Sequence, residues 1–456
     1  MSKVKVTVYI SSHNYAQYLK ESIESVIRQT TSNWELILIN ENSTDNTQDI
    51  FDLYKGDNRV KIFKTKKLGI PSAANFALEK SSGEYFIRLD ADDIFEDNNL
   101  LVLSNYLDSN SDIAMVFPDF YLMDENGNVF SQVRRQPFYH KNHQRDVPPN
   151  GASIMIRSDI LRKIGGYRTD LGAQDGTDLW GKIINAHKYA NVSLPLFYYR
   201  RHENNVTNNN KNIISARRRI KADISGINID KYKPIIAVIP CRKNYDFVSN
   251  LWKVELSNGK SLLDIAIEKC INSSVFDHII VASDTDEVNK TIINYQDSRL
   301  ELFKRETQST ILSKPIAHTL DDITSKYDKD YSGVTYLGVI QAPFVDTSTI
   351  EEGINSLIMH DVESTILVEE INTPVFQRTS HGMNQINKND YIIDDFDTLY
   401  SHTRTCVVTR NSNLKKGSLT GSNIISNIAY DREAFLIKDE RDISIANLIL
   451  KEKKIY

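Results

Sequence analysis

The sequence predicts an α/β protein with two domains, each built on a mostly parallel sheet covered by helices. First, short apolar runs alternate with amphipathic helical segments through residues 6–107, a pattern typical of such a sheet. Second, this alternation restarts at Pro234, directly after a polar stretch. Third, 456 residues with 40% hydrophobic content suffice for two or three buried cores. We therefore expect a first domain over residues 1–221, a linker over 222–233 and a second domain over 234–456.

The first half is expected to alternate strands with helices. Strands are expected at residues 6–10, 34–39, 60–63 and 85–89, and helices at 18–28, 45–54, 71–79 and 98–107. Leu19, Ile23 and Val26 recur at helical spacing, which gives the first helix one apolar face. The run Ser43-Thr44-Asp45 supplies residues that favour the start of the second helix.

The second half repeats this type of alternation. Strands are expected at residues 235–239, 278–282 and 334–340, and helices at 262–270 and 349–359. The two halves share no repeat of fixed period. Their similar openings therefore indicate a common strand, loop and helix solution rather than a duplication.

Composition and charge exclude several classes of protein. The net charge of −5 gives no basic field that would attract nucleic acid. The three cysteines are far apart and form neither a metal-binding spacing nor an even disulfide set, so a reducing compartment is expected. No stretch resembles a signal peptide or approaches the ~20 apolar residues of a membrane span, which predicts a cytoplasmic protein.

One short stretch is locally basic. Residues 211–221 include Arg217, Arg218 and Arg219. One interpretation is a solvated helix face or linker. The other is contact with anionic lipid head groups at the inner face of the cell membrane, or with a phosphate-bearing acceptor.

An acidic motif follows the apolar run Tyr85-Phe86-Ile87. In Arg88-Leu89-Asp90-Ala91-Asp92-Asp93, three carboxylates come at the expected end of a strand. Open α/β sheets bind ligands at the carboxyl ends of their strands, and clustered oxygens there suit a hard divalent cation. Such a cation would hold a nucleoside diphosphate. A loop of solvated acids is the alternative for this motif taken alone.

Several further motifs follow in a fixed order over residues 4–210. They are Val6-Thr7-Val8-Tyr9-Ile10-Ser11-Ser12-His13-Asn14-Tyr15, Tyr18-Leu19, Gln29-Thr30, Glu35-Leu36-Ile37, Gly69, Asn75, Gly83, Asp90-Ala91-Asp92-Asp93, Gly165-Gly166-Tyr167, Gln174-Asp175, Asp178-Leu179-Trp180 and Tyr199-Arg200-Arg201-His202. In this order they resemble the family 2 glycosyltransferases of the GT-A fold, a Rossmann-like mixed sheet flanked by helices. The resemblance implies a transferase that uses a nucleotide-sugar donor.

The resemblance also implies roles around the acidic motif. Asp92 matches the direct ligand of a Mn²⁺ or Mg²⁺ ion, and Asp90 matches a residue that contacts the donor's ribose or reaches the metal through water. His202 matches a late histidine that approaches the metal or the diphosphate, although a lone histidine is often only a packed core residue. The metal would stabilise the charge that develops on the leaving diphosphate.

A carboxylate is also expected to remove the proton from the acceptor hydroxyl. Asp175 matches the general base of the family, whereas Asp178 reads as a structural residue beside Trp180. A helix N-cap is the alternative role for Asp175, and the two roles are compatible. With one base and no second carboxylate placed as a nucleophile, the residues agree with a single inverting displacement.

Recognition of the nucleoside depends on the first two strands. Family members end the second strand with two acidic residues, the second of which accepts the hydrogen bond from uracil N3. Here the pair is Asn40-Glu41, a departure that keeps an acceptor but lengthens it by one methylene. Ser11, Asn14 and Arg200 complete the expected donor contacts. A UDP-sugar is favoured, although the departure leaves a different base open.

Residues 234–456 resemble, more faintly, the cytidylyltransferases that activate sialic acid with CTP. The matching segments are Ile236-Ala237-Val238-Ile239-Pro240-Cys241-Arg242, Asn258-Gly259-Lys260-Ser261-Leu262-Leu263, Phe276-Asp277-His278-Ile279-Ile280-Val281-Ala282-Ser283-Asp284 and Asp439-Glu440-Arg441-Asp442-Ile443. Active members carry a loop of small and basic residues after the first strand and aspartates for magnesium near the end. This chain has bulky residues at 242–252, and Leu436 and Lys438 at the aspartate positions. A nucleotidyltransferase-like domain that no longer makes a CMP-sugar is therefore expected, with a part in acceptor binding, self-association or regulation.

Three functions follow as hypotheses. The first is a glycosyltransferase that builds a surface glycan such as capsule, O-antigen or lipooligosaccharide on a glycan or lipid-linked acceptor. The second is a bifunctional enzyme that also makes a CMP-sugar, and the third is a scaffold without activity. The polar segment 134–150, with His140, His143 and Arg145, is either an acceptor loop or a plain surface excursion.

Overall fold

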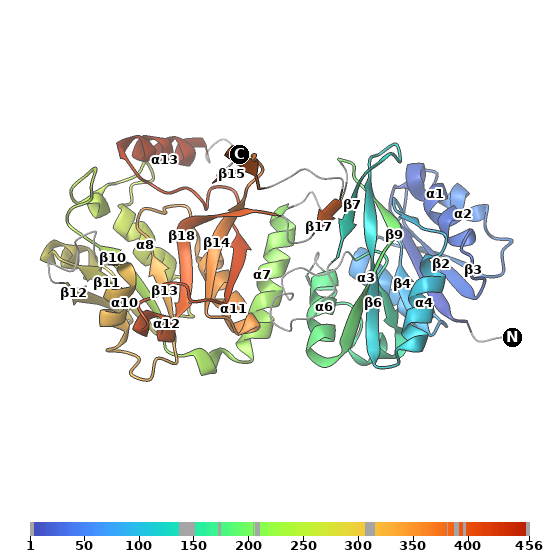
Figure 1. Cartoon of the computed structure of the whole chain (residues 1–456), viewed down its shortest axis with the longest axis horizontal. Coiled ribbons are helices and arrows are strands. Elements are labelled where there is room, and N and C mark those ends of the chain that lie inside the picture. Colours follow the sequence, from blue (N-terminus) through green and yellow to red (C-terminus); the bar gives the residue numbers. More distant parts are fainter. Residues whose placement is uncertain are drawn as a thin grey trace. The chain divides into compact units, whose positions relative to one another are not determined.

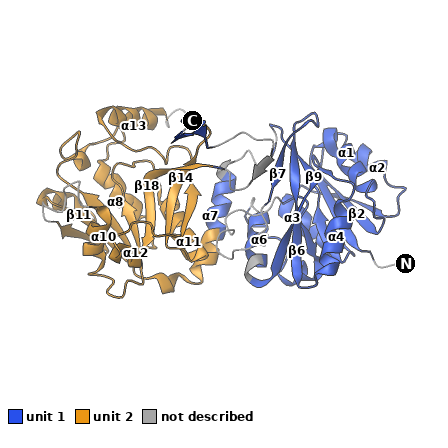
Figure 2. Cartoon of the chain, in the orientation of Figure 1, with its two compact units in different colours: residues 1–220, 374–398 blue, residues 221–373, 399–456 orange. Residues whose placement is uncertain are grey.

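The computed structural model describes residues 4–135, 151–171, 175–203, 205, 210–305, 315–380, 382–386, 392–394 and 398–452. The chain forms two compact units, which Figure 2 colours separately. Unit 1 comprises Met1–Ile220 and Pro374–Thr398, and unit 2 comprises Lys221–Thr373 and Leu399–Tyr456. The predicted α/β class is confirmed for both units.

Unit 1 contains the strands β1 (Val6–Ser12), β2 (Trp34–Glu41), β3 (Val60–Thr65), β4 (Tyr85–Arg88), β5 (Ile94–Phe95), β6 (Ile113–Met123), β7 (Val129–Arg134), β8 (Met155–Arg157), β9 (Lys188–Arg200) and β17 (Ile392–Asp394). Its helices are α1 (Ala16–Ile27), α2 (Thr47–Asp52), α3 (Ile70–Lys80), α4 (Asn99–Ser109), α5 (Ser158–Lys163) and α6 (Asp175–Ala186). The helix α7 (Asn210–Gly226) crosses the boundary between the units.

The sheet of unit 1 is parallel at its centre and mixed at its side. Its order is β17-β7-β6-β8-β4-β1-β2-β3, with β9 beside β5 and β6 (Figure 1). The strands β3, β2, β1 and β4 run parallel, whereas β8 is antiparallel to β4. Because parallel strands end at one edge, the segments that follow β1, β2 and β4 meet there.

Helices cover both faces of this sheet because alternate strand residues point to opposite sides. On one face Val8 and Ile10 of β1 pack in a core with residues of α1, α2 and α4. On the other face Tyr9 packs with residues of α3, α5 and α6. The strands β1, β2 and β4 are almost wholly buried, as near-continuous apolar runs predict, whereas β3 at the edge of the sheet is only partly buried.

The start of α2 differs from the expectation. The helix begins at Thr47 rather than at residue 45, and its N-cap is Asn46. Asp45 still serves the first turn, because its Oδ1 accepts the backbone N–H of Thr47 at 3.1 Å. Its Oδ2 accepts the N–H of Ala16 at 3.0 Å, which ties the starts of α1 and α2 together.

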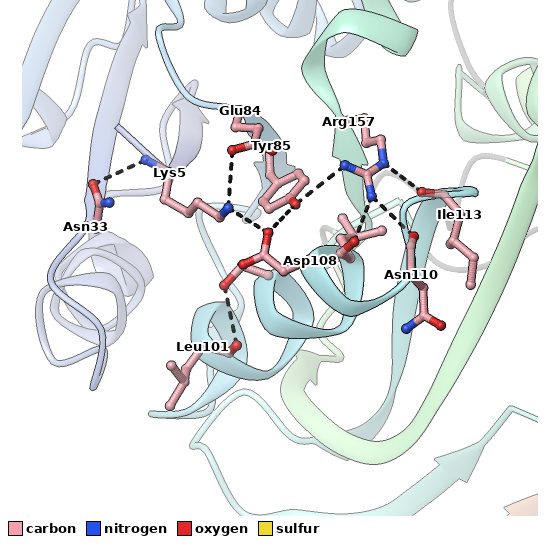
Figure 3. A network of polar contacts seen from close by, with 11 residues as sticks. Lys5, Asn33, Glu84, Tyr85, Leu101, Asp108, Asn110, Ile113 and Arg157 are labelled. Atoms are coloured by element: carbon pink, nitrogen blue, oxygen red, sulfur yellow. Dashed lines mark hydrogen bonds and ion pairs between the residues drawn. The ribbon is translucent and has the colours of Figure 1, made fainter. Parts of the chain in front are cut away.

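A polar network fastens the opposite edge of the sheet (Figure 3). Lys5 Nζ lies 2.6 Å from Asp108 Oδ1, which also accepts the Tyr85 hydroxyl at 2.6 Å. The Arg157 guanidinium donates to the carbonyl oxygens of Ile113 at 2.8 Å and Leu107 at 2.7 Å. The bond to Leu107 satisfies a carbonyl group near the end of α4, and the bond from Tyr85 to Asp108 ties α4 to β4.

A strand from the second half of the chain extends the sheet of unit 1. Ile392–Asp394 forms β17 and pairs in parallel with β7, with Ile393 opposite Val133. The expected division into 1–221 and 234–456 did not include this excursion. Hydrophobic patterning does not reveal it, because the pairing partner is remote in sequence.

Unit 2 contains the strands β10 (Ile235–Cys241), β11 (His278–Ser283), β12 (Leu300–Lys304), β13 (Val334–Gly338), β14 (Ser364–Glu370), β18 (Tyr400–Arg410) and β19 (Ile424–Ile428). Its helices include α8 (Leu262–Ile271), α9 (Asn289–Ile292), α10 (Ile316–Thr324), α11 (Thr347–His360), α12 (Asn411–Lys415) and α13 (Glu440–Glu452), with the 3₁₀ turns η2 (Ile229–Tyr232), η3 (Leu251–Lys253) and η4 (Asp286–Val288). The segment 374–398 carries the hairpin β15 (Phe376–Thr379) and β16 (Gly382–Gln385), assigned with β17 to unit 1.

The two units share one arrangement of central strands. The sheet of unit 2 has the order β12-β11-β10-β13-β18-β14-β19, in which β12, β11, β10 and β13 are parallel and β18 is antiparallel to β13. Unit 1 has the same relation among β3, β2, β1, β4 and β8. The similar sequence openings therefore correspond to similar topology around the first strand of each unit.

The expected linker is largely helical. Residues 222–226 belong to α7, and residues 229–232 form η2. Lys221 is 6% exposed, and its Nζ donates to Glu352 Oε1 at 3.0 Å and to Asn427 Oδ1 at 2.8 Å. In the basic stretch, Arg219 pairs with Asp170 at 2.7 Å. These two side chains are therefore engaged within the protein.

Glu363 of unit 2 gives an expected pH dependence of stability. Its Oε2 accepts the backbone N–H groups of Ser422 at 2.6 Å and Asn423 at 3.0 Å, and these bonds lower the pKa of Glu363 to about 2. A folded-state pKa below the unfolded one stabilises the protein above the unfolded pKa, and this stabilisation is lost as the pH falls toward the folded one. We expect Glu363→Gln to lower the melting temperature at pH 7 and to differ less from the parent as the pH falls from about 4.5 toward 2.

Circular dichroism melts at a series of pH values measure this difference. Glu370→Gln removes an exposed carboxylate at the end of β14 and serves as the control. A difference between Glu363→Gln and the parent that stays constant with pH would contradict the assignment.

Candidate functional site

The acidic motif lies at the end of β4, as the sequence predicts. Asp92 is 9% exposed and Asp93 is fully buried, whereas the side chain of Asp90 is 31% exposed. Solvated surface acids would be far more exposed, so the interpretation of this motif as a plain polar loop is wrong. Burial of adjacent carboxylates is costly unless each finds a partner.

His202 is the partner of Asp92. Its Nε2 lies 2.9 Å from Asp92 Oδ2, and its side chain is only 3% exposed. The sheet explains the meeting, because β5 follows the acidic motif directly and pairs Ile94 with Tyr198 of β9. This antiparallel register carries the end of β9, and His202 after it, back to Asp92.

Two tyrosines from α1 and the loop before it orient the imidazole. The ring of Tyr18 stacks on His202 with centroids 5.2 Å apart, and Tyr15 lies at 5.9 Å. Burial, with the charges of Asp92 and Asp90, raises the pKa of Tyr15 to about 12. The Tyr15 hydroxyl is therefore a neutral group beside the carboxylates.

Arg200 braces the motif from inside. It was expected to contact the donor, but it is 1% exposed. Its guanidinium donates to the Asp92 carbonyl at 2.8 Å, to the Glu125 carbonyl at 3.1 Å and to Glu21 Oε2 at 2.6 Å. It also lies 4.7 Å over the Tyr18 ring. These contacts make Arg200 a support for Asp92 and Tyr18, which leaves little of it facing a ligand.

Asp93 is the most deeply buried carboxylate of the motif. Its Oδ1 accepts the backbone N–H of Arg200 at 2.9 Å, and its buried Oδ2 has no hydrogen-bond partner within the described ranges. Burial raises the pKa of Asp93 well above its usual range, and the charges of Asp92 and Asp90 raise it further. The buried position of Asp93 therefore favours its neutral, protonated form over the carboxylate.

Asp90 pairs with Arg88. The Arg88 Nε lies 2.9 Å from Asp90 Oδ1, and its Nη2 donates to Asp90 Oδ2 at 3.2 Å. Burial raises the pKa of Asp90, the Arg88 guanidinium opposes this, and the charge of Asp92 adds to the rise. Asp90 and Asp92 thus have different partners.

The residues that we expected to contact the nucleoside lie at or just after the carboxyl ends of β1 and β2. Glu41 is 5% exposed, and its Oε2 accepts the N–H groups of Leu68 at 2.9 Å and Gly69 at 2.8 Å. Asn14 accepts the N–H of Thr44 through Oδ1 at 2.8 Å. Glu41 and Asn14 therefore hold neighbouring loops in place. Ser11 is partly exposed near the end of β1.

Asp175 is the first residue of α6, and the described residues next to it lie close to the acidic motif. A Cβ added to the next residue, Gly176, would lie 3.9 Å from Gly151 Cα, and one added to Gly151 would lie 2.5 Å from Arg88 Nη2. The start of α6 therefore lies near the Arg88 and Asp90 pair. Asp178 has a structural environment, with Lys182 Nζ at 2.8 Å and Arg168 Nη1 at 3.7 Å.

The donor set suits a divalent cation that shares its ligands with a substrate. Asp92 and His202 converge, and carboxylate oxygen with imidazole nitrogen is a set that Mn²⁺ accepts. Throughout the described ranges no three His, Cys, Asp or Glu side chains cluster closely enough to hold an ion by themselves. The remaining positions would fall to diphosphate oxygens and water, as is usual at nucleotide sites.

Comparison with known proteins agrees with this geometry. The profile of glycosyl transferase family 2 matches residues 7–163. A glycosyltransferase of Methanocaldococcus jannaschii that is itself uncharacterised is 30% identical over 213 residues, covering 44% of this chain and 72% of the relative. The chain belongs to glycosyltransferase family 2.

Two further similarities cover a comparable share of this glycosyltransferase. The O-antigen biosynthesis glycosyltransferase WbnJ of Escherichia coli is 29% identical over 211 residues, covering 43% of this chain and 80% of WbnJ. The crystal structure of S. aureus TarS residues 1–349 in complex with UDP-GlcNAc is 18% identical, with a TM-score of 0.43, and the similarity covers 48% of this chain and 66% of that one.

Sequence reasoning missed three residues of the site. Arg88 could have been found, because residues two apart in extended chain share a side and Arg88 precedes Asp90 by two. Tyr15 and Tyr18 belong to the quoted motifs, but no local signal places them beside His202, because they meet it only through the fold. His140, His143 and Arg145 lie outside the described residues. None of the helices in the described ranges combines the length and apolar character that crossing a bilayer requires.

Proposed function

We propose that unit 1 transfers a sugar from a nucleoside diphosphate, with UDP favoured, to a hydroxyl group of a surface-glycan acceptor. The pairing of buried Asp92 with His202 at the end of β4 is the observation that carries this proposal. The acceptor class is proposed because the E. coli relative acts in O-antigen biosynthesis by its name.

A Mn²⁺ or Mg²⁺ ion held by Asp92 and His202 would supply Lewis-acid stabilisation to the departing diphosphate. The protein's own residues prepare this site. Tyr18 stacks on His202 and keeps its ring directed at Asp92, while Arg200 holds the Asp92 backbone. Such preorganised charge is effective because it needs no rearrangement during the reaction.

The role of general base, which takes the proton of the acceptor hydroxyl, is assigned to Asp175. A carboxylate at the start of α6 would receive the hydroxyl proton as that oxygen attacks the anomeric carbon and the bond to the diphosphate breaks. One such displacement inverts the configuration. The nearness of Gly176 to Gly151, and of Gly151 to Arg88, supports the placement of this base beside the donor site.

For unit 2 we propose a cytidylyltransferase-like module without nucleotidyltransferase activity, which serves in acceptor binding, self-association or regulation. After β10, Tyr245, Phe247 and Val248 pack against the core, so the loop presents bulky side chains where a phosphate-binding loop needs open backbone. Leu436 packs against the same core, and Lys438 is exposed. A lysine near a magnesium position would repel the ion.

A donor screen tests these proposals. The full chain is incubated with UDP-, GDP- and CDP-linked sugars, with MnCl₂, MgCl₂ or EDTA, and release of the nucleoside diphosphate is measured. We expect release from UDP-sugars with metal and none with EDTA. Absence of release and of metal-dependent UDP binding would favour a scaffold.

A second arm of the screen uses CTP and candidate sugar acids. We expect no pyrophosphate. Its release would show instead that the chain is bifunctional.

A further inference from the structure

Arg88 is a nearly buried guanidinium at the centre of the site. It is the last residue of β4, and its side chain is 12% exposed. Its Nη2 donates a hydrogen bond to Asp90 Oδ2 at 3.2 Å, and its Nε lies 2.9 Å from Asp90 Oδ1 as an ion pair. A planar guanidinium that lies against both oxygens restricts the rotation of the carboxylate more than the point charge of a lysine ammonium would.

Gly151 makes room for this guanidinium. A Cβ at residue 151 would lie 2.5 Å from Arg88 Nη2 and 3.0 Å from its Cζ. Gly151 has no left-handed backbone conformation, so its need for glycine comes from this contact. Ser153 adds a further tie, since its N–H donates to the Arg88 carbonyl at 2.9 Å.

Asp90 and Asp92 therefore have different partners, which suits them to different roles. Asp92 is directed to His202, while Asp90 is directed to Arg88. Asp90 is also the more exposed of the two and keeps lone pairs that the guanidinium does not use. Without the arginine, Asp90 would be free to rotate and to compete with Asp92 for a cation.

We propose that Arg88 is a positioning residue, which holds Asp90 as the acceptor for the ribose hydroxyl groups of the donor and keeps it off the cation. This inference rests on the proposed function of unit 1. In this proposal Arg88 acts through the orientation of Asp90, and Gly151 leaves room for its guanidinium.

Binding of UDP and of 2′,3′-dideoxy-UDP, which lacks the ribose hydroxyls, tests this role by calorimetry with MnCl₂. In the parent we expect UDP to bind at least about tenfold more tightly than the dideoxy analogue, because a hydrogen bond to a charged group is worth about that much. Arg88→Lys keeps the positive charge but loses the planar guanidinium. Gly151→Ala places a methyl group where the guanidinium lies and displaces it from Asp90. Both variants should lose this preference and bind the analogue within about threefold of the parent's affinity for it.

The control is Arg157→Lys, which alters a half-buried arginine paired opposite Tyr85, at the other end of β4 from Arg88. It should keep the preference for UDP. The Mn²⁺ concentration for half-maximal UDP binding should be the same in all four proteins.

Each result has one interpretation. Variants that keep the preference for UDP, or that need more Mn²⁺, would overturn the role of Arg88. Loss of the preference in Arg157→Lys as well would show a general structural effect and would also overturn it. A parent that binds neither nucleotide would instead refute the proposed function.

Discussion

Asp92→Asn is expected to remove metal-dependent donor binding and to lower kcat/KM by about 10³-fold, the scale seen when one group that stabilises developing charge is lost. Asparagine has the size of aspartate and can still bond His202, so the packing around residue 92 is kept. What disappears is the negative charge of the Asp92 carboxylate, which would attract a divalent cation to its place beside His202. Calorimetric titration of UDP with and without MnCl₂ measures the loss directly.

Glu35→Gln is the matched control for Asp92→Asn. The side chain of Glu35 is 5% exposed at the start of β2, where Lys61 Nζ lies 2.7 Å from its Oε2 and Thr7 donates to Oε1 at 2.6 Å. It is a buried carboxylate at the opposite edge of the same sheet. The variant should be less stable than the parent and should bind UDP normally. Equal metal dependence in Asp92→Asn and the parent would refute the role of Asp92.

The sequence predicts β1 to β4 of unit 1 and β10, β11 and β13 of unit 2, because each of these strands is a local apolar run. It predicts no strand for the segments that form β5 to β9, β12 and β14 to β19. The expected strands at 6–10, 34–39, 60–63 and 85–89 all lie on observed strands, and the restart at Pro234 marks the first strand of unit 2. The strand order depends on pairing between distant segments. Nothing local to Ile392–Asp394 indicates that it pairs with β7.

The residues of the candidate site also fall into those predicted from a local signal and those whose contacts depend on the fold. Asp90 and Asp92 were predicted from a strand that ends in acids, a local signal, and they lie where the sheet requires. Glu41 was assigned by resemblance, yet its Oε2 is occupied by the N–H groups of Leu68 and Gly69. A carboxylate that caps a loop and one that accepts from a base look alike in sequence, because the difference lies in which donors the fold delivers.

Arg200 is a second case, because its sequence position does not show whether its side chain is buried. Its position in the run Tyr199-Arg200-Arg201-His202 indicates a site residue, and the site does include it. It is nevertheless 1% exposed, with its donors turned toward Asp92, Glu125 and Glu21. We therefore expect Arg200 to act on the donor only through the residues that it supports.

Asp175→Asn is expected to lower kcat by about 10²- to 10⁴-fold, the range for loss of a general base, and to leave UDP affinity unchanged. The amide cannot take the acceptor proton, whereas the cation and the diphosphate are held by other groups. Asp178→Asn is the control on the same helix, because Asp178 faces Lys182 and Arg168. That variant should lose thermal stability and keep its turnover per folded molecule. Sugar transfer at saturating donor separates the two effects, and a weakened UDP affinity in Asp175→Asn with unchanged kcat would place Asp175 at the donor rather than at the acceptor.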